Sequence, residues 1–260
     1  LSILSLLISS CGSNKLEKTN SFKNEDAFKS QQLNEESESE TLSIVMSLQD
    51  KLDAYAQVAK SKISPEYKKV MLESLQRLKN QQLETRFPKI GDKAKNFKLK
   101  DFNGNEIELY DVLKEKAVVL LFYRGSWCPY CNLELKEYKD YYQQFINEGL
   151  QILAISPEQP SFTQRFQNKN FFPFPLLFDK KNKLASKYHL TFTLDPELVP
   201  IYKQFGIDVG LRNGDGKWEM PVPVTMIISK DKVIKYVFAD VDYKNRAEPD
   251  SVLAVAKARL

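Results

Sequence analysis

The sequence predicts an α/β protein in which a mixed central β-sheet is flanked by helices. In the middle of the chain, short apolar strand patterns alternate with helical patterns, which is typical of parallel strands joined by helices. Strand pairs joined by turn signals stand before and after that part, and such pairs run antiparallel. The expected order is therefore ββ, then βαβαβα, then ββα.

Composition limits the function classes. The chain has 260 residues, of which 42% are hydrophobic, enough for one domain with appendages or for two small domains. Its formal net charge of +4 comes from interleaved acidic and basic residues. Because no basic stripe is interleaved with aromatic residues, we expect no nucleic-acid partner.

The N-terminus reads as an export signal. Residues 1–10 form an apolar and small-residue run that is too short to span a bilayer. The run ends in Ile-Ser-Ser-Cys11, which resembles the lipobox of bacterial lipoproteins. We therefore expect residues 1–11 to be a signal peptide with a truncated start, and Cys11 to be acylated. The protein would be exported and lipid-anchored to a bacterial membrane, facing the periplasm or the cell surface. The alternative is an ordinary signal peptide with an incidental cysteine.

Two segments separate this signal from the main domain. Residues 12–41 are polar, with a small acidic cluster at 35–40, and are expected to form a disordered tether. Residues 42–88 show helical spacing of apolar residues and are expected to form an N-terminal helical extension. Ser64 and Pro65 match an N-cap and a first helical residue. The extension would either pack on the main domain or support a homodimer.

Residues 89–260 are expected to form the main domain. The predicted strands and helices follow one another along the chain, with an irregular insertion at 192–210 that contains a short helix. The strands are expected at 97–100, 107–109, 118–123, 150–155, 175–178, 224–228 and 233–239, and the helices at 129 onward, 161–168, 181–188, 197–205 and 249–260.

A C-x-x-C motif lies where the apolar strand at 118–123 becomes a helix. Cys128 and Cys131 are separated by two residues, and Pro129 fits the first helical position. A helix start carries unpaired N–H groups and partial positive charge, which lower the pKa of a thiol placed there. The thiolate is the form that attacks peroxides and disulfides, so the pair is expected to be redox-active. Placement deep in apolar packing would count against this.

Three other interpretations of the pair remain. It could be a structural disulfide, half of a zinc site, or two buried thiols. Zinc would require two more ligands, and the chain offers only His189 and Cys11 as further histidine and cysteine. We expect His189 to be a surface or core histidine, and we expect no metal or organic cofactor.

The sequence also resembles the thioredoxin fold. A buried strand runs into Trp-Cys-Pro-Tyr-Cys at a helix start, and a later Val-Pro-Val-Thr enters a hairpin. In that fold a cis proline opposite the cysteine pair begins a core strand, and the matching residue here is Pro223. A trans edge-strand proline is the alternative for this position.

Within that fold, residues 91–260 more closely resemble the alkyl hydroperoxide reductase/thiol-specific antioxidant family, in its peroxiredoxin-like branch with Phe-Tyr-Arg-Gly-x-Trp-Cys-Pro-Tyr-Cys. The family's Pro-x-x-x-Thr-x-x-Cys motif, commonly followed by Glu three residues later, places the peroxidatic cysteine at Cys131 and the Glu at Glu134. Its Thr and Pro positions hold Cys128 and Arg124 instead. The thioredoxin register makes Cys128 the exposed attacking thiol and Cys131 the resolving one.

Charged residues near the pair are candidates for a supporting role. Arg124 could lower a thiolate pKa and hold a peroxide oxygen, or could be a surface arginine at a strand end. Arg246 and Arg212 are candidates for a second cation. Glu134 would oppose ionisation of a nearby thiol unless an arginine neutralises it.

Three functional hypotheses follow. The first is a thiol peroxidase in which Cys131 attacks the peroxide, Cys128 closes a disulfide, and a thioredoxin-like dithiol protein reduces it. The second is a thiol–disulfide oxidoreductase in which Cys128 attacks protein disulfides. The third is a non-enzymatic surface lipoprotein with a static disulfide.

Overall fold

A computed structural model of the chain describes residues 46–260. The signal peptide, its Cys11 and the tether expected at 12–41 therefore lie outside the described residues. Within residues 46–260, none of the helices is both long and apolar enough to cross a bilayer.

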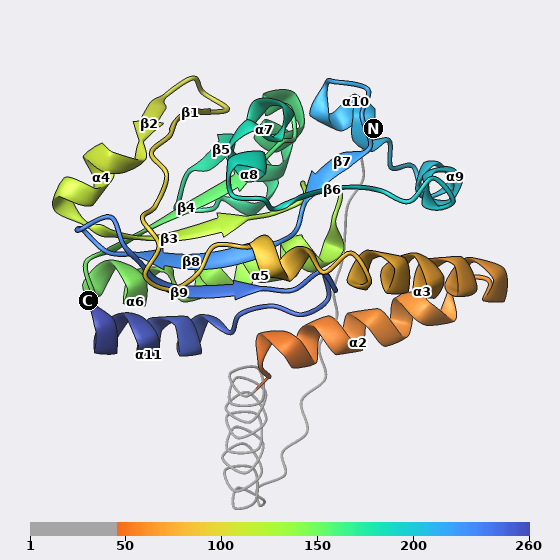
Figure 1. The fold of residues 1–260 in the computed structure, drawn as a ribbon, viewed down its shortest axis with the longest axis horizontal. Coiled ribbons are helices and arrows are strands. Elements are labelled where there is room, and N and C mark those ends of the chain that lie inside the picture. The colour runs from red at the N-terminus through yellow and green to blue at the C-terminus, as the bar shows by residue number, and fades with distance from the viewer. Residues whose placement is uncertain (1–45) are drawn as a thin grey trace, which may run out of the picture. The chain divides into compact units, whose positions relative to one another are not determined.

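Seven strands form one mixed sheet in the order β2-β1-β5-β4-β3-β8-β9 (Figure 1). The neighbours β3, β4 and β5 run parallel, and the other neighbouring pairs are antiparallel. The strands are β1 (Lys98–Asp101), β2 (Glu106–Glu108), β3 (Ala117–Phe122), β4 (Leu150–Ser156), β5 (Leu176–Phe178), β8 (Val224–Ile228) and β9 (Ile234–Ala239). A separate antiparallel pair joins β6 (Thr191–Thr193) to β7 (Glu219–Pro221). The predicted mixed sheet flanked by helices is confirmed.

Helices cover both faces of the sheet, and Figure 1 shows α2 and α11 on the same side of it. The helices are α2 (Leu48–Ser61), α3 (Pro65–Lys79), α4 (Leu109–Glu115), α5 (Pro129–Asp140), α6 (Tyr142–Asn147), α7 (Pro160–Asn170), α8 (Lys183–Lys187), α9 (Leu198–Gln204), α10 (Val209–Asn213) and α11 (Pro249–Arg259), with 3-10 turns at Leu83–Arg86 and Lys180–Asn182. One core, under α2, α5 and α11, contains the cysteine pair. A second core lies under α4 and α8.

The strand β3 divides these two cores. Its apolar residues are fully buried and point alternately to opposite faces, as the two-residue repeat of a strand requires. The first core receives Val119, Leu121 and the following Tyr123, and the second receives Val118, Leu120 and Phe122. This placement fixes the turn after Tyr123 at the edge of the first core, where the cysteine pair follows.

The N-terminal helices pack on helices of the main domain, α2 on α5 and α3 on α9. Ser47 and Ser64 cap α2 and α3 as side-chain acceptors, and Pro65 opens α3. The α2 residues Leu48 and Leu52 are completely buried in the same core as the cysteines. This is the packing role that the sequence offered as one of two alternatives.

Local differences from the sequence-based elements have simple causes. Leu109, expected at a strand end, begins α4, because its buried side chain enters the second core. The insertion at 192–210 contains the end of β6, the helix α9 and the first residues of α10. His189 is a surface residue with a positive φ of 57°.

Candidate active site

The cysteine pair lies at the start of α5. Cys128 is the N-cap residue, Pro129 is the first helical residue, and Cys131 follows within the first turn. Both sulfurs are free thiols. The expectation of an exposed Cys128 in the thioredoxin register is wrong, because Cys128 is 1% exposed and Cys131 is fully buried. The surroundings of the two sulfurs therefore decide whether burial leaves them inert.

A tight turn connects β3 to this helix. Gly125 has a φ of +145°, and a Cβ placed there would lie 2.5 Å from the indole nitrogen of Trp127. The next N–H, of Ser126, donates to the Glu158 carboxylate at 2.7 Å, and Glu158 in turn pairs with Arg212 at 2.7 Å. The turn thus needs glycine for its conformation and a buried carboxylate to hold its backbone.

Arg124 points into the protein beside the pair. It is 3% exposed, so the surface-arginine alternative is wrong. Its guanidinium lies between the rings of Trp127 and Tyr243, 4.8 and 4.3 Å from their centroids, and donates to the Tyr202 hydroxyl at 2.8 Å. Although burial opposes its charge, Tyr202 and the two cysteines raise the pKa of Arg124. The side chain therefore stays cationic next to the sulfurs.

Arg246 is the second cation of the site. It is 5% exposed, its Nη2 donates to the Cys131 sulfur at 3.6 Å, and its Nε lies 3.1 Å from the Glu134 carboxylate. Of the two arginines that the sequence offered for this role, Arg246 takes it, whereas Arg212 pairs with Glu158. Glu134 is buried and neutralised by an arginine, the condition that the sequence analysis set for tolerating it.

The two sulfurs differ in their tendency to ionise. Burial by itself would raise the pKa of Cys128, but the Cys131 thiol, Arg124 and Arg246 together lower it to about 5. Burial, together with the Cys128 sulfur, raises the pKa of Cys131. We therefore assign the resident thiolate to Cys128, where the helix start also favours negative charge. The sequence-based assignment of the first attack to Cys131 rested on the family register alone.

Glu134 responds to the same environment in the opposite direction. Burial raises the pKa of its carboxyl to about 7, although Arg246 lowers it; the Cys128 thiolate adds to the rise. A carboxyl in this range can hold or release a proton near neutral pH.

Pro223 lies close to the pair through the sheet. It is buried and directly precedes β8, whose first residue, Val224, pairs with Phe122 at the end of β3. Because β8 lies between β3 and β9, the edge-strand alternative is wrong. The cis peptide bond at this position stays a prediction.

Aromatic side chains cover the pair. Tyr130 packs edge-on against Tyr55 of α2 and Tyr243, with ring centroids 5.2 Å apart in each case. The Cys128 sulfur contributes to the raised pKa of both Tyr55 and Tyr130, after burial. Sequence reasoning did not single out Tyr55, Tyr202 or Glu158, because each comes from a segment far from the motif.

Comparison with known proteins identifies a family for the central part of the chain. Residues 90–237 match the model of the AhpC/TSA family. The chain is 34% identical over 99 residues to thiol-disulfide oxidoreductase ResA of Halalkalibacterium halodurans, covering 38% of this chain and 55% of that protein. It is 33% identical over 99 residues to peroxiredoxin Bcp of Bacillus subtilis, covering 38% of this chain and 62% of that protein. The match thus spans little more than half the length of these relatives.

Solved structures confirm the thioredoxin-like fold. Peroxidoxin BcpB from Mycobacterium tuberculosis aligns with a TM-score of 0.52 and 23% identity, over 65% of this chain and 97% of that chain. Reduced Prx3 from Vibrio vulnificus in complex with hydrogen peroxide aligns with a TM-score of 0.52 and 15% identity, over 65% and 99%. At these identities the likeness concerns the fold alone.

Proposed function

The chain belongs to the AhpC/TSA family, and from this premise we propose that it is a thiol peroxidase that reduces hydrogen peroxide or organic hydroperoxides through Cys128 and Cys131. The observation that carries the proposal is a thiol pair buried beside two guanidinium groups, which lower the pKa of one thiol to about 5. Such a thiol is ionised at neutral pH, and a peroxide needs less space to reach a buried sulfur than a protein disulfide does.

The first step is attack of the Cys128 thiolate on the terminal peroxide oxygen. The S–O bond forms as the O–O bond breaks, so the sulfur is oxidised to sulfenic acid and the peroxide is reduced. The leaving oxygen takes the proton that Cys128 released on ionising and departs as water or an alcohol. Arg124 and Arg246 stabilise the negative charge that moves from sulfur to oxygen.

The second step closes the disulfide. The Cys131 thiol condenses with the Cys128 sulfenic acid, forming the S–S bond and releasing water. The oxidised site then opens, and an external dithiol protein, thioredoxin-like, transfers two electrons and two protons to it, regenerating both thiols. This order reverses the roles that the family register assigns to the two cysteines, and the lowered pKa of Cys128 supports the reversal.

A second candidate function is thiol–disulfide exchange with protein substrates. The ResA relatives and an N-cap position for the more acidic thiol favour it. The 1% exposure of Cys128 disfavours it, because a protein disulfide must reach that sulfur in line. A static disulfide in a non-enzymatic lipoprotein is disfavoured by two buried arginines that would lose their thiolate partner.

Two further parts of the proposal rest on sequence alone. The apolar run at 1–10 and the Ile-Ser-Ser-Cys11 motif support export and lipid anchoring to a bacterial membrane. We also propose that the protein forms a homodimer, which sedimentation would test.

Stopped-flow mixing of the reduced protein with hydrogen peroxide tests the proposal. We expect peroxide consumption to be faster than that of a free thiol at the same pH by at least about 100-fold. Trapping of sulfenic acid in single variants assigns the roles. Cys131→Ser should accumulate the sulfenate and Cys128→Ser should not. Consumption at the free-thiol rate would overturn the peroxidase proposal, and a sulfenate only in Cys128→Ser would restore the family register.

A further inference from the structure

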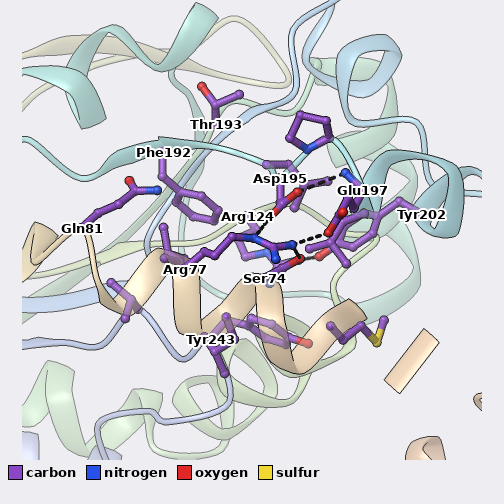
Figure 2. Close-up of a pocket in the computed structure, with 17 residues that line it drawn as sticks. Ser74, Arg77, Gln81, Arg124, Phe192, Thr193, Asp195, Glu197, Tyr202 and Tyr243 are labelled. Carbon is purple, nitrogen blue, oxygen red and sulfur yellow. Dashed lines mark hydrogen bonds and ion pairs between the residues drawn. The ribbon is translucent and has the colours of Figure 1, made fainter. Parts of the chain in front are cut away.

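A cavity of about 590 Å³ lies between α3 and the segment that joins β6 to α9 (Figure 2). Its floor contains Arg124, Tyr202 and Tyr243. Arg124 is also one of the groups that lower the pKa of Cys128, together with Cys131 and Arg246, so this side chain connects the cavity to the cysteine pair. The Arg124 Nε has no hydrogen-bond partner among the described residues, and at 3% exposure the side chain is also shielded from water. A buried, unpaired N–H of this kind requires an acceptor.

The walls above this floor are apolar. They come from α3 on one side and from the β6–α9 segment on the other, and they include Met71, Leu75, Leu78, Phe192, Leu194 and Leu198. An occupant therefore has an apolar body and one polar, hydrogen-bond-accepting end that faces Arg124.

The rim carries an excess of negative charge. Figure 2 shows Arg77 between Asp195 and Glu197, and its Nε lies 2.6 Å from the Asp195 carboxylate. The second carboxylate, of Glu197, pairs with the other end of the same guanidinium. One cation against two anions leaves the rim with one net negative charge, which disfavours an ionised carboxylate on the part of the occupant that lies at the rim, away from the Arg124 cation at the floor.

We propose that this cavity is a substrate-tail site that makes the enzyme selective for bulky, uncharged, apolar hydroperoxides, with Leu75 of α3 as a specificity-determining side chain. This inference rests on the proposed peroxidase function. The hydroperoxide oxygens lie against Arg124, beside the Cys128 sulfur, and the tail fills the space under α3. The chemical step is unchanged: the S–O bond forms, the O–O bond breaks, and the bulky alcohol leaves.

Size supports this assignment. A molecule as small as hydrogen peroxide occupies about the volume of one water, roughly 30 Å³. The cavity is about twenty times larger and falls within the range of sites for drug-sized ligands. Five of its seventeen lining residues come from α3, which precedes the residues 90–237 that match the family model. The selectivity thus depends in part on the N-terminal extension of this chain.

The test compares four substrates with the full chain: hydrogen peroxide, cumene hydroperoxide, linoleic acid hydroperoxide and its methyl ester. We expect kcat/KM for the methyl ester to exceed that for the free acid by about tenfold. We expect kcat/KM for cumene hydroperoxide to exceed that for hydrogen peroxide by a similar factor. Equal values for ester and acid would contradict the charge argument.

Filling the cavity tests its location. Leu75→Trp should lower kcat/KM for cumene hydroperoxide by about tenfold or more. It should leave kcat/KM for hydrogen peroxide within about twofold of the wild-type value. Leu72→Trp is the matched control, because Leu72 lies on the same helix but is 66% exposed and outside the cavity. Leu198→Trp fills the cavity from the opposite wall and replaces Leu75→Trp if that variant does not fold.

The outcomes separate the two proposals. If the wild-type protein reduces neither hydrogen peroxide nor any of the three organic hydroperoxides, the peroxidase function fails. The other outcome is that the filling variants change kcat/KM for hydrogen peroxide and for cumene hydroperoxide by the same factor, or change neither value. If so, and hydrogen peroxide is reduced, the peroxidase function stands and the tail site is wrong.

Discussion

Removing Arg246 is the most direct perturbation of the thiolate. Its Nη2 lies 3.6 Å from the Cys131 sulfur, and its positive charge also lowers the pKa of Cys128. At an effective dielectric constant of about 20, a unit charge about 4 to 7 Å away is worth about 2 to 4 kcal/mol. One pKa unit corresponds to about 1.4 kcal/mol. We therefore expect Arg246→Gln to raise the pKa of Cys128 from about 5 to between about 6.5 and about 8.

Thiolate absorbance near 240 nm, recorded against pH, measures this shift without a reagent that must enter the buried site. The Cys131→Ser background isolates the Cys128 sulfur, and the difference from a Cys128→Ser/Cys131→Ser protein removes the tyrosine contribution. Arg165→Gln is the control, because Arg165 is an exposed arginine on α7. The peroxide rate should follow the same midpoint, rising as pH increases through it.

Two results would refute this reasoning. A wild-type midpoint at the ordinary thiol value of about 8.5 would mean that the buried arginines do not ionise the pair. An unchanged midpoint in a folded Arg246→Gln variant would mean that Arg124 and the helix start account for the whole effect.

Three further predictions concern stability and its pH dependence. Gly125→Ala should lower the free energy of unfolding by about 1 to 3 kcal/mol more than Gly104→Ala in urea titrations, because both glycines have positive φ but only Gly125 is crowded. Glu158→Ala should cost about 2 kcal/mol in the same assay, since it leaves a partly exposed Arg212 without its partner; a loss below about 0.5 kcal/mol would contradict this. Burial raises the pKa of Glu134 to about 7, so its contribution to stability is present below pH 4.5 and is lost as pH rises to about 7. Glu134→Gln should remove that dependence, and an unchanged profile would refute it.

The fold was predictable because its signals are local. Six consecutive apolar residues at 117–122 require a strand buried on both faces, and Pro129 marks the helix start within the same short stretch. The hairpin of β8 and β9 and the helix that begins at Pro249 follow from turn and cap residues in the same way. Such patterns need no knowledge of distant contacts.

The site was predictable only as far as the motif extends. Cys128, Cys131 and Arg124 lie within one stretch, so the sequence identified them together. Arg246 joins Cys131 across 115 residues, and the sequence could name it only as one of several arginines. Tyr55 reaches the site because α2 packs on α5, and a tyrosine on an amphipathic helix carries no sign of its target. Burial of the cysteines depends on that packing too.

Charge balance connects the burial of the pair to its turnover. Two guanidinium groups, of Arg124 and Arg246, are buried at the site. Above about pH 7, where Glu134 is ionised, its carboxylate balances one of them and the Cys128 thiolate balances the other. An uncompensated buried charge costs several kcal/mol, so the reduced site is stable because Cys128 is ionised. Formation of a disulfide removes that anion and leaves one cation without a partner. The oxidised site is therefore the less stable of the two in this packing. In the proposed cycle this favours both its opening toward a dithiol protein and its reduction.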